Sequence, residues 1–320
     1  MKRILIVMAA LIAGAAALSP SAGAQTAVRM DGGLPRVDLW KPGHMPNSKG
    51  LNLPDSVARN RTWRIGMPRI YVYQPGPEDR SRTAVLVIPG GGYAKQAYET
   101  AGDAIAKWLN GIGVTAFVLI HRLPNSPDLI DGSLAPTQDA QRALRYIRHH
   151  AEEFGIDPQR IGVMGCSSGG HVSACVSTIG EDWSAVGDEL DAERFRPDFA
   201  ILISPVISLQ DPIANVGSRD MLLGERKNDP ALRTRFSMDE QVTAANPPTL
   251  FIHAANDTSV PQQNSIRMYN ALVDAGVRGS SLHIFPHGGH AIALRRQPGS
   301  TAVWPEIAEM WMKEIGVLEF

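Results

Sequence analysis

Apolar positions follow two different spacings along the chain. Short runs rich in valine and isoleucine are separated by longer stretches in which apolar residues recur every three or four positions. The short runs predict buried strands, and the longer stretches predict amphipathic helices. The predicted strands span residues 70–73, 85–88, 114–120, 161–164, 199–203, 249–253 and 282–285. The predicted helices span residues 100–110, 137–154, 170–179, 261–275 and 302–315.

This order of elements predicts the fold class. Continuously apolar strands separated by helices are typical of a mostly parallel sheet covered by helices on both faces. We therefore expect one α/β domain over residues 68–320. The connection 210–246 is polar, so no large lid domain is expected, although a capping box at 237–240 predicts that a short helix begins there. Residues 25–67 are rich in Pro, Gly, Asn and Arg without a sustained period, which predicts an irregular extension over the domain surface.

The first 24 residues have the pattern of a secretory signal peptide. Lys2 and Arg3 precede an uncharged apolar run, and the small residues Ala22 and Ala24 mark a cleavage site before Gln25. A retained membrane anchor is the alternative, but the run is shorter than the roughly 20 residues that a membrane span needs. We expect an exported protein, periplasmic or extracellular, with no membrane span after cleavage.

Composition narrows the possible partners. The 320 residues include 31 Lys and Arg against 32 Asp and Glu, with 44% hydrophobic residues. This balance is that of a globular protein and excludes a disordered, collagen-like or coiled-coil chain. The absence of a basic block argues against nucleic acid as a partner. Cys166 and Cys175 lie too far apart along a helix for a disulfide, so both are expected to be buried thiols.

The segment 165–169 has the pattern Gly-Cys-Ser-Ser-Gly between a predicted strand and a predicted helix. A turn this sharp requires glycine on both sides, and it lifts the hydroxyl of Ser167 above the sheet. Ser167 is therefore the candidate nucleophile. A glycine-rich turn with a capping serine is the alternative interpretation.

A serine nucleophile needs a base and an acid that orients it, and on such sheets they follow in the order Ser, acid, His. Asp257 follows the strand 249–253 and is the candidate acid, although an Asx-turn or helix cap is also possible. His287 and His290 follow the strand 282–285, and we favour His290 because two glycines before it let the loop turn inward. A metal site on this histidine pair lacks a third ligand nearby, so no metal or cofactor is expected.

Acyl transfer also requires donors for an oxyanion. Three glycines, 90–92, directly follow the strand 85–88, and we expect the N–H groups of Gly91, Gly92 and Ser168 to form an oxyanion hole. A phosphate-binding loop is disfavoured because the glycine spacing is wrong. Tyr93 is a candidate for lining the acyl pocket, and Trp183 is a candidate for stacking on a sugar. Asp139 and Arg142 are expected to brace the sheet, and His171 to pack beneath the elbow.

With these residues in place, the chain resembles the α/β-hydrolase esterases, and most closely exported bacterial acetylxylan esterases, including bifunctional acetylxylan/feruloyl esterases. Hormone-sensitive-lipase-like enzymes are a more distant resemblance. The matching motifs are Pro89–Tyr93, Trp108-Leu109 through His121–Pro124, Asp139–Ala143, Gly165–His171, Arg196–Phe199, Pro247-Pro248, Asn256-Asp257 and Gly288–His290. Pro89 stands where the lipase-like enzymes have histidine before the glycines, and His121 replaces a more usual tyrosine.

The resemblance implies a Ser-His-Asp carboxylesterase that removes acetyl groups from plant polysaccharide such as xylan or its oligosaccharides, through an acyl-enzyme. A feruloyl esterase or a general short-chain carboxylesterase is the alternative. A serine peptidase is less expected because the chain has no room for an added propeller. An inactive glycan-binding relative is less expected because Ser167, Asp257 and His290 are all present.

Overall fold

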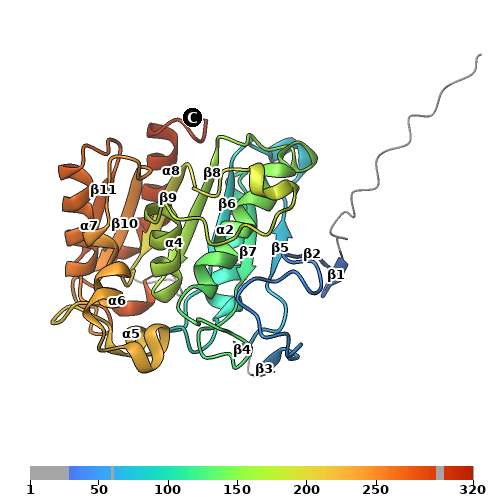
Figure 1. Cartoon of the computed structure of the whole chain (residues 1–320). Helices are drawn as coiled ribbons and strands as arrows, with labels where there is room; N and C mark the ends of the chain where they lie inside the picture. The colour runs from blue at the N-terminus through green and yellow to red at the C-terminus, as the bar shows by residue number, and fades with distance from the viewer. Residues whose placement is uncertain (1–28, 59–60, 293–298, 320) are drawn as a thin grey trace, which may run out of the picture.

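The computed structural model describes residues 29–58, 61–292 and 299–319. The expected signal peptide, residues 1–24, lies outside the described residues. Within the described part, nine strands form one sheet in the order β1-β2-β5-β7-β6-β8-β9-β10-β11 (Figure 1). The strands from β7 onward along this order are parallel, whereas β1, β2 and β5 are joined by antiparallel pairing. The predicted α/β fold with a mostly parallel sheet is confirmed.

The predicted strands agree with those observed to within two residues at each end. The strands of the sheet are β1 (Arg29–Asp31), β2 (Leu34–Asp38), β5 (Arg69–Tyr73), β6 (Ala84–Ile88), β7 (Thr115–Ile120), β8 (Ile161–Cys166), β9 (Phe199–Ile203), β10 (Thr249–Ala254) and β11 (Ser281–Phe285). Alternate side chains of β6 enter different cores: Leu86 and Ile88 pack on one face, Val85 and Val87 on the other. Because both faces are buried, the strand is apolar at every position.

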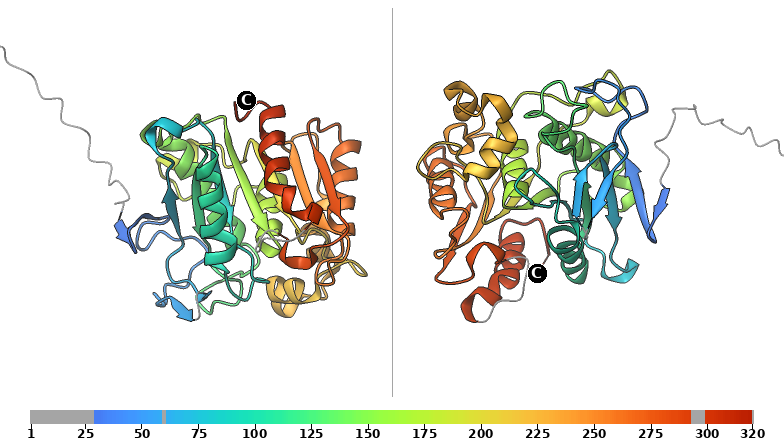
Figure 2. Two further views of the ribbon diagram at one scale, coloured as in Figure 1. Left: turned by 180° about the vertical axis from the view of Figure 1, so that it is seen from behind. Right: turned by 90° about the horizontal axis from the view of Figure 1, so that it is seen from below.

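Helices cover both faces of this sheet. The helices α2 (Ala135–His149), α4 (Ser168–Thr178) and α7 (Gln263–Asp274) cover one face, and α1 (Ala104–Gly111) and α8 (Trp304–Glu314) the other (Figures 1 and 2). The short elements outside the connection 210–246 are η1 (Pro77–Asp79), η2 (Glu99–Asp103), α3 (Ala151–Phe154), η3 (Glu189–Ala192), η6 (Gly289–Ala291) and η7 (Gly299–Val303). No helix among the described residues is long and apolar enough to cross a membrane.

Part of the expected irregular extension is regular structure, which corrects that expectation. Strand β2 pairs antiparallel with β5, and β1 pairs with β2, so both extend the main sheet. A separate two-stranded sheet is formed by β3 (Ser56–Ala58) and β4 (Arg61–Arg64). Strand β2 contains one fully buried apolar residue, Val37. Its pairing partner lies more than thirty residues away, so the local sequence pattern was too weak to predict it.

The connection 210–246 also differs from expectation. It contains α5 (Val216–Leu223), η4 (Gly224–Arg226), α6 (Pro230–Arg235) and η5 (Met238–Glu240). The capping box at 237–240 does not form, because Ser237 Oγ accepts from the N–H of Leu209 at 2.9 Å and donates to the carbonyl of Arg233 at 2.7 Å. Only a three-residue 3₁₀ turn follows, so the tertiary contacts of Ser237 override the local motif.

A buried ion pair connects α2 to the start of the loop after β7. Arg122 Nη2 donates to Asp139 Oδ1 at 2.8 Å, and both side chains are at most 2% exposed. Trp40 Nε1 donates to the same oxygen at 2.9 Å. Asp139 therefore joins the N-terminal segment, the loop and the helix, while Arg142 pairs instead with Asp188 at 2.5 Å.

Cys166 and Cys175 are free, buried thiols, as expected, and burial raises the pKa of each to about 12.

Candidate active site

The turn between β8 and α4 holds Ser167 in a strained conformation. Its φ of 56° and ψ of −124° lie outside the regions that non-glycine residues usually occupy. A Cβ on Gly165 would lie 2.2 Å from the carbonyl oxygen of Gly169, and a Cβ on Gly169 would lie 2.0 Å from that of Ile88. Both flanking residues must therefore be glycine for the turn to close.

Three side chains from different loops form a continuous chain of hydrogen bonds. His290 Nε2 lies 2.8 Å from Ser167 Oγ, and His290 Nδ1 lies 2.7 Å from Asp257 Oδ2. The other carboxylate oxygen of Asp257 accepts from the N–H groups of Ser259 and Val260 at 2.8 and 2.9 Å. The Asp257 side chain is fully buried, whereas that of His290 is 29% exposed. The structure thus brings together the three residues that the sequence nominated.

The environment of Asp257 favours its ionised form. Burial alone would raise the pKa of Asp257, but hydrogen bonds from His253, from His290 and from the N–H of Val260 together lower it well below the usual value. His253 is fully buried at the end of β10, with Nε2 3.5 Å from Asp257 Oδ2. His253 was not predicted from the sequence, although a histidine inside an otherwise apolar strand was an available signal.

The segment after β11, which includes η6, brings one of its two histidines to Ser167. His287 is exposed and makes no side-chain contact with Ser167 or Asp257 among the hydrogen bonds of the described residues, whereas His290 contacts both. The N–H of Gly289 donates to Asn256 Oδ1 at 2.9 Å, which ties the histidine loop to the residue beside Asp257. Gly288 and Gly289 have φ values of 142° and 57°, so the inward turn uses conformations that favour glycine.

The glycine-rich loop after β6 packs directly on the Ser167 turn. A Cβ on Gly90 would lie 3.1 Å from Ser167 Cβ and 2.5 Å from the carbonyl oxygen of Cys166. The N–H groups of Gly91 and Gly92 donate to Ser168 Oγ at 3.1 and 2.9 Å. The loop therefore lies beside the nucleophile candidate as expected, but these two N–H groups are directed at a side-chain oxygen that the sequence analysis did not consider.

Tyr93, expected to line the acyl pocket, is a buried residue and is not among those that line the cavity described below. Its side chain is buried and its hydroxyl lies 2.6 Å from His171 Nδ1. His171 Nε2 lies 2.8 Å from the carbonyl oxygen of Phe236, which only accepts, so Nε2 carries the proton and Nδ1 accepts from Tyr93. Burial lowers the pKa of His171 to about 4, in keeping with a neutral ring. Both residues support the loop from beneath.

The Trp183 side chain makes contacts with neighbouring residues of the protein. Its indole N–H donates to Glu181 Oε2 at 3.0 Å, and the guanidinium of Arg235 lies 5.1 Å from its ring centroid. The ring also packs against Phe236. Trp183 is not among the residues that line the cavity between the loop after β7 and the α5–η4 segment.

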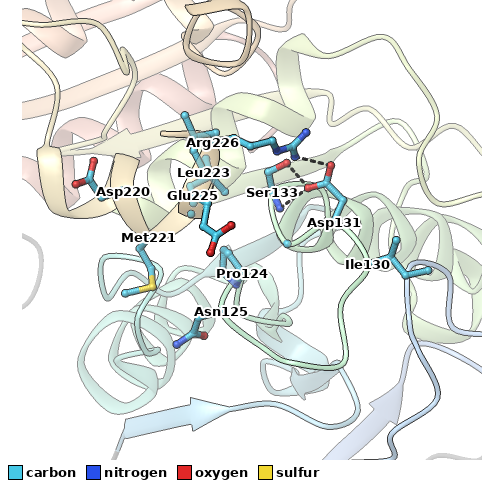
Figure 3. Close-up of a pocket in the computed structure, with 13 residues that line it drawn as sticks. Pro124, Asn125, Ile130, Asp131, Ser133, Asp220, Met221, Leu223, Glu225 and Arg226 are labelled. Atoms are coloured by element: carbon cyan, nitrogen blue, oxygen red, sulfur yellow. Dashed lines mark hydrogen bonds and ion pairs between the residues drawn. The ribbon is translucent and has the colours of Figure 1, made fainter. Parts of the chain in front are cut away.

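A cavity of about 630 Å³ lies between the loop after β7 and the α5–η4 segment (Figure 3). Met221, Leu222 and Leu223 contribute an apolar wall. Asp131 and Arg226 form an ion pair at 2.7 Å across the two walls (Figure 3). The remaining lining residues are Pro124, Asn125, Ile130, Gly132, Ser133, Asp220, Gly224 and Glu225.

The wall formed by α5 adjoins the Ser167 site. A Cβ on Gly92 would lie 3.9 Å from Ser218 Oγ in α5. At the start of the same helix, Asn215 Nδ2 donates to the carbonyl of Ser259, two residues beyond Asp257. The cavity and the hydrogen-bonded chain therefore share one edge of the sheet, where the strands β6, β7, β8 and β10 end.

Known proteins with similar sequences are esterases and xylan-degrading enzymes. An acetylxylan esterase of Xylanibacter ruminicola is 34% identical over 221 residues, which is 68% of this chain and 42% of the relative. Endo-1,4-beta-xylanase B of Butyrivibrio fibrisolvens is 29% identical over 272 residues, 81% of this chain and 42% of the relative. The chain thus spans less than half the length of these curated relatives.

Solved structures and a family profile agree with the sequence comparison. An acetyl ester-xyloside bifunctional hydrolase from Caldicellulosiruptor lactoaceticus superposes with a TM-score of 0.76 at 34% identity, covering 88% of this chain and 97% of that one. An esterase from Thermogutta terrifontis, at 24% identity and a TM-score of 0.66, shows the same fold. The profile of the BD-FAE family matches residues 70–272, more than half of the chain. The chain belongs to the BD-FAE family and has the α/β-hydrolase fold.

Proposed function

We propose that this protein is a serine carboxylesterase that removes short acyl groups, acetyl foremost, from plant polysaccharide such as xylan or its oligosaccharides. The observation that carries the proposal is the hydrogen-bonded chain from Ser167 through His290 to Asp257. A serine hydroxyl becomes a nucleophile when an adjacent base accepts its proton, and the third residue orients that base. Both hydrogen bonds of this chain are already within 2.8 Å.

The reaction follows from these contacts. As Ser167 Oγ bonds to the ester carbonyl carbon, His290 Nε2 accepts its proton and Asp257 stabilises the resulting imidazolium. Donors of Ser168, which the Gly91–Gly92 loop holds in place, stabilise the oxyanion. The tetrahedral intermediate then expels the sugar alkoxide, which takes the proton from His290. Water repeats the sequence on the acyl-enzyme and releases the acid.

Two features support a carbohydrate leaving group. The similar proteins include an acetylxylan esterase, a xylanase and an acetyl ester-xyloside hydrolase. The cavity between the loop after β7 and the α5–η4 segment combines an apolar wall with carboxylates and a guanidinium, which suits a sugar with an apolar ring face and polar hydroxyls. Its wall of Met221, Leu222 and Leu223 also favours a second candidate, a feruloyl or butyryl esterase.

We also propose that the protein acts outside the cytoplasm. The support is the sequence pattern of residues 1–24, with its positive start, apolar run and small residues before Gln25. Mass spectrometry of the exported protein tests this: an N-terminus at Gln25 is expected, and an intact N-terminus at Met1 would contradict it.

The proposed function is tested by acid release from acetylated xylan, acetylated pectin and methyl ferulate, compared for wild type and Ser167→Ala. We expect acetate release from xylan to exceed ferulate release, and Ser167→Ala to lose about 10⁶-fold in turnover, as in a related triad. Thermal unfolding of both proteins controls for folding. A Ser167→Ala variant that retained a tenth of wild-type turnover would refute the assignment.

A further inference from the structure

The hydroxyl of Ser168 occupies an unusual position between the glycine-rich loop and the nucleophile turn. Its oxygen accepts from the N–H of Gly91 at 3.1 Å and from the N–H of Gly92 at 2.9 Å. The N–H of Tyr93 lies farther away, at 3.4 Å. Two consecutive backbone N–H groups therefore donate to this oxygen at close range, with a third farther away, and Ser168 as a residue is only 3% exposed.

This arrangement fixes the direction of the hydroxyl proton. A serine hydroxyl has one O–H donor and two acceptor lone pairs. The N–H groups of Gly91 and Gly92 use the two lone pairs, and neither group is able to accept the serine proton. The O–H must therefore point away from the loop. Among the hydrogen bonds of the described residues, Ser168 Oγ serves only as an acceptor, so no acceptor for its proton is found in that part of the chain.

The loop that holds the Ser168 hydroxyl lies against the nucleophile turn. Gly90 packs against Ser167 Cβ, so the loop that holds the Ser168 hydroxyl is in contact with the nucleophile turn itself. Ser168 is also the first residue of α4, and its backbone N–H is one of the helix N-terminal donors that have no carbonyl partner within the helix. One residue thus offers two donors, N–H and O–H, beside Ser167.

We propose that the Ser168 hydroxyl is itself a donor to the oxyanion, together with the N–H of the same residue. This inference rests on the proposed esterase function. The N–H groups of Gly91 and Gly92 act through this hydroxyl: by donating to its oxygen they hold it in place and polarise its O–H bond. The glycine loop therefore supports the oxyanion donor instead of serving as the direct donor that the sequence suggested.

The hydroxyl stabilises charge and transfers no proton. When Ser167 Oγ bonds to the carbonyl carbon, the π electron pair of the C=O moves onto the carbonyl oxygen. The Ser168 O–H donates to that oxygen while its own bond stays intact. The donor is released when the C=O re-forms and the leaving alkoxide takes the proton from His290. Because the interaction strengthens as charge develops, it lowers the barrier more than it tightens substrate binding.

The test compares Ser168→Ala, which removes the hydroxyl, with Ser168→Thr, which keeps it. Ser177→Ala is the matched control, because Ser177 is a buried serine of the same helix whose hydroxyl donates to the carbonyl of Ser173. We expect Ser168→Ala to lower kcat on p-nitrophenyl acetate by about 10²-fold, the typical effect of one oxyanion donor, with KM within about twofold of wild type. Ser168→Thr is expected to recover most of this loss, and Ser177→Ala to retain wild-type kcat.

A transition-state analogue separates donation from a purely structural effect. The affinity for a trifluoromethyl ketone, which forms a tetrahedral oxyanion on Ser167, is expected to fall in Ser168→Ala by the same factor as kcat/KM. The inference is overturned if Ser168→Ala keeps kcat within threefold of wild type, or if its loss of kcat leaves ketone affinity unchanged. In either case Ser167→Ala remains inactive; an active Ser167→Ala would instead overturn the proposed function.

Discussion

His290 Nδ1 lies 2.7 Å from the buried carboxylate of Asp257, and the pKa of that carboxyl is lowered by the groups that donate to it. A lowered pKa means that Asp257 is ionised throughout the pH range of an esterase assay. His290 is then the single group whose protonation blocks the reaction, since it must be neutral to accept the Ser167 proton.

The first prediction concerns pH. On the acid side, log kcat/KM is expected to rise with a slope of one, because Asp257 is already deprotonated and adds no second proton. Asp257→Asn is expected to lower kcat by about 10⁴-fold, as in a comparable triad. A slope of two, or a rate independent of pH between 5 and 8, would contradict a lone histidine base.

The ionised carboxylate of Asp257 also contributes to the free energy of unfolding. This contribution is present above the usual aspartate pKa of about 3.9 and is lost as pH falls further.

The second prediction separates the two histidines of the loop after β11. His290→Ala is expected to reduce kcat as severely as Ser167→Ala, because both remove one end of the same 2.8 Å contact. His287→Ala is expected to retain most activity, because His287 is exposed and lies outside the chain. Steady-state kinetics on p-nitrophenyl acetate measure both. Loss of activity in His287→Ala alone would show that the loop rearranges in solution.

The third prediction concerns the cavity. Arg226→Met removes the guanidinium that pairs with Asp131, and we expect it to raise KM for acetylated xylo-oligosaccharides about fivefold, equivalent to ~1 kcal/mol. Its kinetics on p-nitrophenyl acetate should stay unchanged, because that substrate has no sugar. Arg235→Met is the matched control, since Arg235 pairs with Glu181 away from the cavity lining. Equal effects of Arg226→Met on both substrates would exclude a sugar-binding role.

The fourth prediction concerns the acyl group. We expect p-nitrophenyl acetate to be preferred, with activity falling steeply beyond about four carbons. Each additional CH₂ gains about 0.8 kcal/mol only where an apolar surface buries it, and the apolar wall of the cavity is limited to Met221, Leu222 and Leu223 with Ile130 and Pro124. A chain-length series measures this. A maximum at eight carbons or longer would favour a lipase-like enzyme instead.

The fifth prediction concerns stability. Asp139→Ala leaves the buried Arg122 without its carboxylate and is expected to lower the free energy of unfolding by about 3–5 kcal/mol. Trp40→Phe removes one hydrogen bond to the same carboxylate and is expected to cost about 1 kcal/mol. Urea unfolding followed by fluorescence compares the two. Equal losses would indicate that the ion pair adds nothing beyond packing.

The sequence by itself determined the central sheet and the order of the reactive residues. Fully buried parallel strands are apolar at every position, so residues such as 85–88 and 249–253 were recognisable without their neighbours. The Ser167 turn was recognisable because Gly165 and Gly169 are required by contacts within the turn and with the adjacent strand. These signals depend on residues that are close together in the sequence, so the sequence alone is enough to recognise them.

Tertiary structure decided what depends on partners distant in the sequence. Strand β2 forms because it pairs with the edge of β5. Ser237 does not form the capping box because its hydroxyl bonds to the N–H of Leu209 and to the carbonyl of Arg233. His253 beneath Asp257, and Ser168 Oγ beneath the amides of Gly91 and Gly92, acquire their positions only when separate strands are brought together. A hydrogen bond depends on tenths of an ångström between such groups, and residue spacing along the chain does not specify distances of that kind.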